Sequence, residues 1–182
     1  MTKILFLIQE KELKNIFIVS ADGGEPVRLT KKDKKGFQYT STRWCPDGKK
    51  IAFRSLDYGS WEKGEKAEPI SIWTMDVKEG ELKLVTEGLF GWDLCWSSDG
   101  RYILSSKKEE SSKGPWQEGQ RVFRVSADGG APEKMNINGS APDYSPDGKK
   151  IAYSRLVEYG TEYWIVENFL PEEKGPKKSK SR

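Results

Sequence analysis

The heptapeptide PDGKKIA occurs at residues 46–52 and again at 146–152, so the chain must build the same structural unit more than once. A variant of it, SDGRYIL, occupies residues 98–104. The Asp-Gly pairs of the three copies therefore follow one another at intervals of about 50 residues. A second motif, SADGG, occurs at residues 20–24 and 126–130.

Each copy joins a turn to segments that favour β-strands. The copies align without gaps as WCPDGKKIAF, WSSDGRYILS and YSPDGKKIAY, beginning at residues 44, 96 and 144. The segments that follow them, at 71–77, 121–130 and 162–168, are rich in β-branched and aromatic residues that pack well on a pleated surface. A partial copy lies at the N-terminus, where residues 4–9 match 51–56 and residues 15–24 match 121–130.

Turn chemistry connects these strands. Proline fixes φ at the first corner of Pro-Asp-Gly, aspartate bonds its own backbone, and glycine accepts a positive φ. The flanking strands are therefore expected to form tight hairpins. No segment keeps a 3.6-residue apolar period over three turns, which argues against helices.

We therefore predict an all-β fold, a β-propeller made of four-stranded antiparallel blades. The chain holds about four blades, two complete and two partial, because its predicted strands group as three, four, four and three. The predicted blades cover residues 1–30, 39–86, 91–137 and 140–171. Residues 172–182 form a basic tail that we expect to be disordered. The repeated aromatic residues are expected to pack between blades.

The repeated pattern resembles a known propeller family. The pattern begins with an aromatic residue followed by Ser-Pro-Asp-Gly-Lys-Lys-Ile-Ala and Phe or Tyr, and continues with Ile, then Trp or Phe, two variable residues and Asp or Ser, before Gly-Gly and Leu-Thr. It resembles the WD-like repeat of TolB and of the propellers of prolyl-oligopeptidase-type and tricorn-type proteases. The resemblance covers about residues 1–171. It implies a propeller with a binding or scaffolding role but no particular ligand, since propellers host unrelated functions.

Fourteen strands do not fill the six or more blades that propellers of this family usually have. Three explanations stay open at this point: the chain is a short or truncated member, it closes as a small four-bladed ring, or open blade edges pair between two chains in a homodimer.

Composition narrows the function classes. The 31 basic and 28 acidic residues give a net charge of +3, which argues against a nucleic-acid-binding protein. The chain has no histidine, which removes Ser-His-Asp catalysis and histidine metal ligands, and we expect no metal, no cofactor and no enzymatic activity. Cys45 and Cys95 form no metal-binding spacing, and buried free thiols fit them better than a disulfide.

The apolar run at residues 4–8 is too short for a signal peptide or a membrane span. The sequence as written therefore predicts a cytoplasmic protein, although TolB-like relatives are often periplasmic.

Long connections between strands are the candidate binding surface. The connections at 56–71 and 106–120 each hold one tryptophan in polar surroundings, Trp61 and Trp116. The crossings at 31–39 and 86–93 open on the same face and contribute three more aromatic residues, Phe37, Phe90 and Trp92. Arg43, Asp93 and Asp143 are expected to line a central channel, where paired-carboxylate catalysis is disfavoured. The alternative is that these loops only cover hydrophobic surface.

The leading hypothesis is a non-catalytic module that binds a protein, a peptide or a glycan through this loop-rich face. The alternatives are a substrate-gating propeller detached from a prolyl-oligopeptidase-type protease and a carbohydrate-active propeller.

Overall fold

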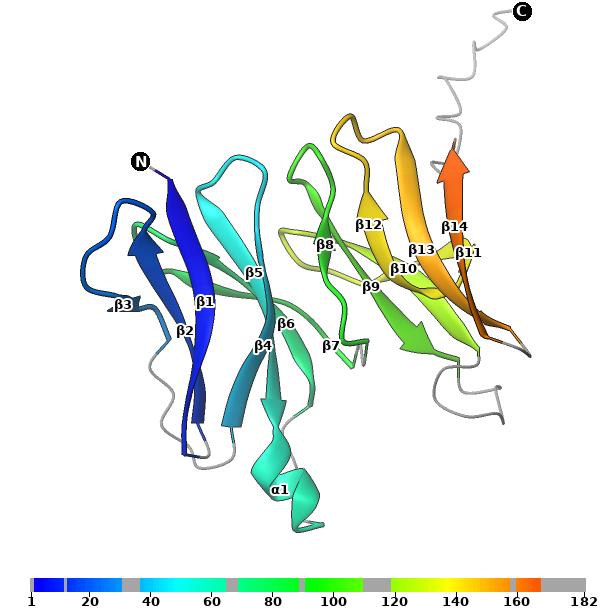
Figure 1. The fold of residues 1–182 in the computed structure, drawn as a ribbon. Coiled ribbons are helices and arrows are strands. Elements are labelled where there is room, and N and C mark those ends of the chain that lie inside the picture. The colour runs from blue at the N-terminus through cyan, green and yellow to red at the C-terminus, as the bar shows by residue number, and fades with distance from the viewer. Residues whose placement is uncertain are drawn as a thin grey trace, which may run out of the picture.

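A computed structural model of the chain describes residues 2–11, 13–30, 37–64, 69–88, 91–109, 119–157 and 160–167. Fourteen strands and one short helix form the regular structure of these residues. The strands form antiparallel meanders that stand side by side along the molecule, from the N-terminus at one end to the C-terminal strand at the other (Figure 1). The predicted all-β fold is confirmed.

The strands divide into four groups, which we call units 1 to 4. Unit 1 holds β1 (Lys3–Glu10), β2 (Leu13–Ser20) and β3 (Val27–Arg28). Unit 2 holds β4 (Phe37–Trp44), β5 (Lys50–Asp57), β6 (Ser71–Asp76) and β7 (Leu82–Glu87). Unit 3 holds β8 (Cys95–Trp96), β9 (Tyr102–Lys108), β10 (Gln120–Ser126) and β11 (Glu133–Asn138). Unit 4 holds β12 (Ser140–Tyr144), β13 (Lys150–Val157) and β14 (Gly160–Glu167).

Hydrogen bonding follows this division with one exception. Units 3 and 4 are separate sheets, with strand orders β11-β10-β9-β8 and β12-β13-β14. Units 1 and 2 join into one seven-stranded sheet, through a parallel bridge between Lys14 of β2 and Gln38 of β4. The assignment of blades to exact residue ranges therefore stays a prediction.

The Asp-Gly turns of units 2 and 3 share one end of the molecule, which we call the turn end. The amide of Val77, after β6, donates to the carbonyl of Lys49 in the β4–β5 turn, over 2.9 Å. The amide of Ala127, after β10, likewise donates to the carbonyl of Arg101 in the β8–β9 turn, over 2.8 Å. The β5–β6 and β9–β10 connections lie at the opposite end, the loop end, where α1 (Tyr58–Glu62) also lies (Figure 1).

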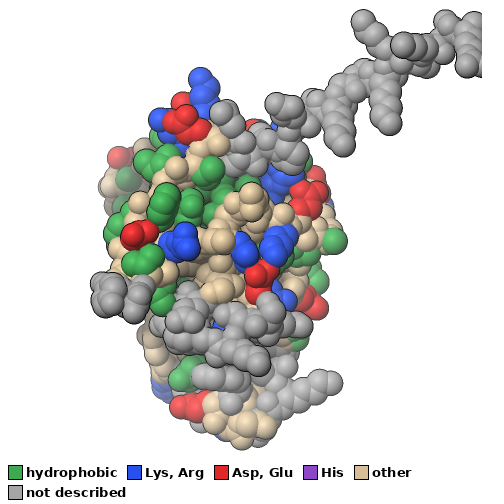
Figure 2. All heavy atoms as spheres, turned by 90° about the vertical axis from the view of Figure 1, so that its right-hand side faces the viewer, with side chains coloured by type: hydrophobic (Ala, Val, Ile, Leu, Met, Phe, Trp, Pro, Cys, Tyr) green, Lys and Arg blue, Asp and Glu red, His purple; other side chains and the backbone are tan. Residues whose placement is uncertain are grey.

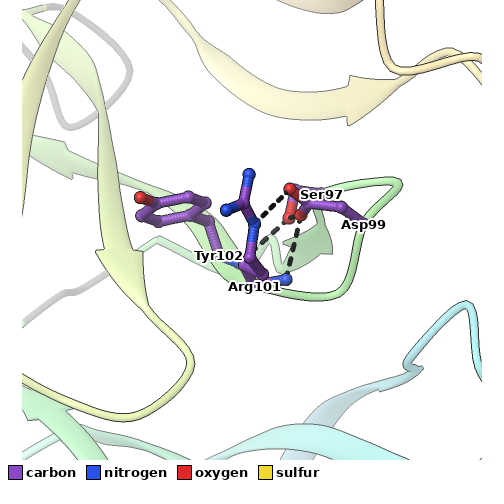
Figure 3. Close-up of polar contacts among 4 residues, drawn as sticks. All are labelled: Ser97, Asp99, Arg101 and Tyr102. Atoms are coloured by element: carbon purple, nitrogen blue, oxygen red, sulfur yellow. Dashed lines mark hydrogen bonds and ion pairs between the residues drawn. The ribbon is translucent and has the colours of Figure 1, made fainter.

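The β8–β9 turn shows how the repeated motif closes a hairpin (Figure 3). The Asp99 carboxylate accepts hydrogen bonds from the Ser97 hydroxyl over 2.6 Å and from the Arg101 amide over 3.0 Å. The Arg101 guanidinium forms an ion pair with the same carboxylate over 2.6 Å. In the other two copies, Asp47 and Asp147 accept the amide two residues later in the same way. The predicted turn chemistry is therefore present in all three copies.

Three apolar cores lie between successive units. The core between units 1 and 2 contains Ile16, Tyr39, Ile51, Phe53 and Met75. The core between units 2 and 3 contains Cys45, Ala52, Ile72, Val85, Leu94, Trp96, Ile103, Val125 and Ala127. The core between units 3 and 4 contains Cys95, Leu104, Val122, Met135, Ile137 and Ile151. Each sheet thus buries its faces against its neighbours, because one meander alone cannot cover both of them.

Most of the repeated aromatic residues pack in these cores, as predicted. Trp96 is buried, and Trp44, Trp73, Phe123 and Tyr144 pack against the cores while partly exposed. Trp164, the last of the series, differs because it is 44 % exposed.

Two details differ from the sequence-based expectation. The connection after β5 was expected to be a loop, but it begins with the five-residue helix α1. Phe37 was expected in a crossing, but it is the first residue of β4, where its backbone pairs with Asp57. At Phe37, pairing with the end of β5 extends the strand into a segment whose composition is polar.

Cys45 and Cys95 are buried free thiols, as predicted. Burial raises the pKa of Cys45 to about 11 and that of Cys95 to about 12. The ionised thiolate, which is the reactive form, is therefore scarce at neutral pH.

Candidate functional site

The crossing from β7 to β8 is described at Gly88 and from Gly91 to Leu94, and backbone hydrogen bonds hold both of these parts. The amide of Gly88 donates to the carbonyl of Ile70 over 2.8 Å, and the amide of Gly91 donates to the carbonyl of Ser106 over 2.8 Å. A Cβ atom on Gly91 would overlap the Asp93 carboxylate and both oxygens of Ser106. Only glycine therefore fits at this position, and the crossing is held close against β9.

Asp93 anchors the crossing. Its carboxylate accepts hydrogen bonds from the hydroxyl of Ser105 over 3.3 Å and from the amide and the hydroxyl of Ser106, each over 3.0 Å. It also accepts the backbone amide of Ala141, in unit 4. One half-buried carboxylate therefore ties the crossing both to its own sheet and to the next one.

A corresponding contact joins unit 2 to the crossing that leads into unit 3. Ser41, Asp93 and Ala141 occupy equivalent positions in the repeat, three residues before Trp44, Trp96 and Tyr144. The Ser41 hydroxyl donates to the carbonyl of Trp92 over 2.6 Å. Ser41 and Ala141 have positive φ angles of 54° and 51°, and β4 and β12 both have a register shift beside them. A bulge at this position thus lets the first strand of a unit reach its neighbour.

Trp92 lies on the surface above a buried arginine. The indole of Trp92 is 63 % exposed, whereas Arg54 of β5 is fully buried. The guanidinium carbon of Arg54 lies 4.9 Å from the centroid of the Trp92 ring, a cation–π distance. Within the described residues, the Nε and Nη1 atoms of Arg54 have no hydrogen-bond partner. Burial lowers the pKa of Arg54 to about 10, and the charge of Asp93 opposes this shift.

A hollow of about 210 Å³ lies between units 3 and 4, also at the loop end. It is lined by Glu109, Gly119, Gln120, Arg121, Asn138, Gly139, Arg155 and Leu156.

The charges around the hollow are unequal. The Arg121 guanidinium and the Glu109 carboxylate form an ion pair over 3.1 Å, and Lys134 contacts the same carboxylate. The hydrogen bonds from Lys134 and Arg121 lower the pKa of Glu109, so that it is ionised at neutral pH. Arg155 lies across the hollow, exposed and without a carboxylate partner in the described part of the chain. The lining therefore carries two guanidinium groups and one carboxylate, together with the amides of Gln120 and Asn138.

Arg43 and Asp143 occupy equivalent positions in units 2 and 4 and are both exposed. Cys95 holds this position in unit 3, and its thiol donates to the Asp143 carboxylate over 3.3 Å. The Arg43 guanidinium donates to the carbonyl of Thr42 over 3.0 Å, and the Arg43 carbonyl accepts the indole N–H of Trp96 over 3.2 Å. The contacts of Cys95 with Asp143 and of Trp96 with Arg43 link neighbouring units, and the expected lining of a channel by Arg43, Asp93 and Asp143 stays a prediction.

The structure brings only some of the predicted site residues together. Asp93 and Trp92 lie in the same crossing, while Arg43 and Asp143 lie on the first strands of units 2 and 4. Trp116 and Phe90 lie outside the described residues. For Phe37 and Trp61 only the backbone is described, in β4 and α1. The expectation that Trp61 and Trp116 share one face therefore falls outside the described residues.

Sequence reasoning missed two features, Arg54 and the hollow. The repeat alignment contains a signal for Arg54, because this residue stands where the other copies have Ser106 and Ser154. Unit 1 has Leu7 at this position, so Arg54 is the only charged residue among the four copies. The hollow has no such signal, since its lining comes from β10, β11 and β13 and from the β9–β10 and β11–β12 connections.

Among the described residues, no three histidine, cysteine, aspartate or glutamate side chains lie close enough to hold a metal ion. In the same residues, no helix has the length and apolar character needed to span a bilayer.

Comparison with known proteins rests on structure alone. No protein-family model matches the chain, and no curated protein sequence matches it. TolB from Acinetobacter baumannii superposes with a TM-score of 0.70 and 19 % identity, over 91 % of this chain and 39 % of that one. An oligogalacturonate lyase from Vibrio parahaemolyticus gives a TM-score of 0.62 and 16 % identity, over 86 % of this chain and 42 % of the lyase. A prolyl endopeptidase gives a TM-score of 0.65 and 15 % identity, over 91 % of this chain and 26 % of the peptidase.

The chain thus spans less than half the length of each of these three proteins. They include both TolB and enzymes, so the shared fold does not decide between binding and catalysis. Their likeness agrees with the repeated turns, the meanders and the cores between sheets described above. The chain therefore has the TolB-like β-propeller fold.

Proposed function

We propose that this chain is a non-catalytic propeller module that binds a protein or peptide partner through its loop end. The observation that carries the proposal is the pair formed by Trp92 and Arg54. An exposed indole stacked on a buried cation is held in place by a crossing that is itself fixed by Asp93 and Gly91. Tryptophan and arginine are the residues most often found at the centres of protein interfaces.

The hollow between units 3 and 4 adds a preference for acidic partners. The positive charge of its two guanidinium groups exceeds the negative charge of its single carboxylate. Arg155 is exposed, so it can contact a ligand. Guanidinium groups bind carboxylates through paired, charge-assisted hydrogen bonds. We therefore propose that a partner places an aspartate or glutamate side chain in this hollow while an apolar side chain packs on Trp92.

The proposal is tested with a library of random twelve-residue peptides displayed on phage and selected on the intact chain. The selected peptides are expected to share an acidic residue and an apolar one. Their affinity should fall about tenfold or more for Trp92→Ala, because a central aromatic contact contributes at least 1–2 kcal/mol. Arg155→Gln should weaken the acidic peptides, and a higher salt concentration should weaken them in parallel.

The matched control is Leu82→Ala, since Leu82 is 49 % exposed on β7. Peptides that bind this control and the two variants as well as the native chain would contradict the proposed surface. Failure to select any peptide, together with binding to a glycan array that is lost in Trp92→Ala, would replace the protein partner by a carbohydrate.

A further inference from the structure

Two residue positions of the repeat lie on opposite faces of each sheet, and each interface between units contains one of them from either side. Position A is held by Ile4, Ile51, Ile103 and Ile151, and position B by Ile16, Ile72, Val122 and Tyr163, in units 1 to 4. Strand register confirms that these positions are equivalent in the four units. In each unit, the residue after position A pairs with the residue two places after position B. The pairs are Leu5 with Ile18, Ala52 with Thr74, Leu104 with Arg124 and Ala152 with Ile165.

Each apolar core unites position B of one unit with position A of the next. Ile16 and Ile51 share the first core, Ile72 and Ile103 the second, and Val122 and Ile151 the third. All six of these side chains are fully buried. The rule is therefore the same at all three interfaces.

The two remaining positions are the exceptions. Tyr163, at position B of unit 4, is 86 % exposed, and Ile4, at position A of unit 1, is 50 % exposed. Ile165 and Leu156 lie on the same face as Tyr163 and are 67 % and 40 % exposed. Figure 2 shows hydrophobic side chains gathered on this end of the molecule, with charged side chains beside them. On the other end, Phe6 and Phe17 stack beside Ile4 with ring centroids 6.1 Å apart.

These two faces cannot meet within one chain as it stands, because units 1 and 4 lie at opposite ends (Figure 1). We propose that a second copy of this chain covers them, so that the position-B face of unit 4 packs on the position-A face of unit 1 of the partner, and vice versa. The chain itself supplies both halves of the interface, in the same order and register that its three internal interfaces use. Such head-to-tail contacts form a closed ring when the rotation between copies allows it.

The proposal concerns sheet faces and is distinct from pairing through the open hydrogen-bonding edges of strands. It is also independent of partner binding at the loop end. An experiment can therefore contradict self-association without contradicting partner binding, and the reverse.

The test is the mass of the intact chain in solution, measured by light scattering after size exclusion or by sedimentation. The native chain is expected to have twice the monomer mass of 20.7 kDa. Tyr163→Glu and Ile4→Glu should each weaken association about tenfold or more, since each places a charge in an apolar interface. Because both positions are exposed within one chain, neither variant should change the circular dichroism spectrum. Leu82→Glu, at an exposed apolar residue outside both faces, should keep the native mass.

Mixing the two variants distinguishes this geometry from a face-to-face dimer. In the mixture, the intact unit 4 of the Ile4→Glu chain can pack on the intact unit 1 of the Tyr163→Glu chain. The mixture should therefore associate more strongly than either variant alone at the same total concentration. A native monomer, a dimer insensitive to Ile4→Glu, or a mixture no stronger than the separate variants would overturn the proposal. Further propeller units, in a longer chain or another protein, would then be the occupants of these faces.

Discussion

The guanidinium of Arg54 and the indole of Trp92 lie 4.9 Å apart across the interface between units 2 and 3, one fully buried and the other mostly exposed. An arginine in such a place is costly, because two of its N–H-bearing atoms lack partners among the described residues. Proteins keep residues that cost stability where function needs them, so the cost of Arg54 agrees with the proposed binding surface.

The first prediction concerns the stability that Arg54 costs. Arg54→Met keeps an unbranched side chain and removes the buried charge. We expect the free energy of unfolding to stay the same or to rise by about 1 kcal/mol, because a well-packed apolar replacement of a buried charge is often neutral or stabilising. Urea denaturation of both proteins measures the difference. A loss of more than about 1 kcal/mol would show that Arg54 supports the fold itself.

The second prediction concerns the crossing. Gly91→Ala should lower the free energy of unfolding by about 2 kcal/mol or more, because a Cβ atom there meets the Asp93 carboxylate and the Ser106 backbone. Gly80→Ala is the matched control. Gly80 has open space around it but a φ of 71°, so its substitution should cost only about 1 kcal/mol of backbone strain. Equal losses in the two variants would contradict the close packing of the crossing.

The third prediction concerns the thiols. With pKa values of about 11 and about 12, Cys45 and Cys95 should react with an aromatic disulfide reagent at pH 8 at least about a hundredfold more slowly than a free model thiol. Both should react at the ordinary rate in 6–8 M urea. Fast labelling of one thiol in the native protein, followed by mass spectrometry of the labelled peptide, would identify a cysteine that is less buried than the structure shows.

The fourth prediction is a pH dependence at the turn end. Burial alone would raise the pKa of Asp99, but hydrogen bonds from Ser97 and Arg101 outweigh it and lower this pKa to about 2 (Figure 3). A carboxylate with a lowered pKa in the folded state adds stability above its unfolded value, near 4, and loses it as the pH falls toward 2. Because the side chain is 42 % exposed, solvent screening reduces the contribution to about 1 kcal/mol or less.

Asp99→Asn should therefore lower stability at pH 7 and converge with the native chain near pH 2. Thermal melts at a series of pH values measure this. A constant difference between the two proteins from pH 7 to pH 2 would contradict the assigned role of the carboxylate.

The sequence predicted the regular part of the fold well. The predicted strands at 4–9, 71–77 and 83–86 lie within one residue of β1, β6 and β7. The sheets of the structure hold seven, four and three strands, so the predicted grouping into blades of three, four, four and three strands stays a prediction. These features depend on local patterns, namely alternating apolar residues and Asp-Gly turns, which can be recognised in short segments of the sequence.

The candidate site was predicted only in part. Trp92 and Asp93 were selected because an aromatic and an acidic residue stood in a connection, which is a local signal. The partner of Trp92 was not found, because Arg54 lies 38 positions earlier in a strand that resembles its neighbours in every other respect. The hollow between units 3 and 4 depends on how two sheets pack against each other, and this packing cannot be predicted from any single segment of the sequence.

The indole N–H of Trp96 provides the most direct test of the account, because it bonds the carbonyl of Arg43 in the neighbouring sheet over 3.2 Å. This contact exists only if unit 3 stacks face to face on unit 2. In an ¹⁵N-edited nuclear Overhauser spectrum of the intact chain, we predict cross-peaks from this proton to protons of Arg43 or Trp44 and slow exchange with solvent. A Trp96 indole proton that exchanges rapidly and shows no cross-peak to either residue would contradict the stacking of the sheets.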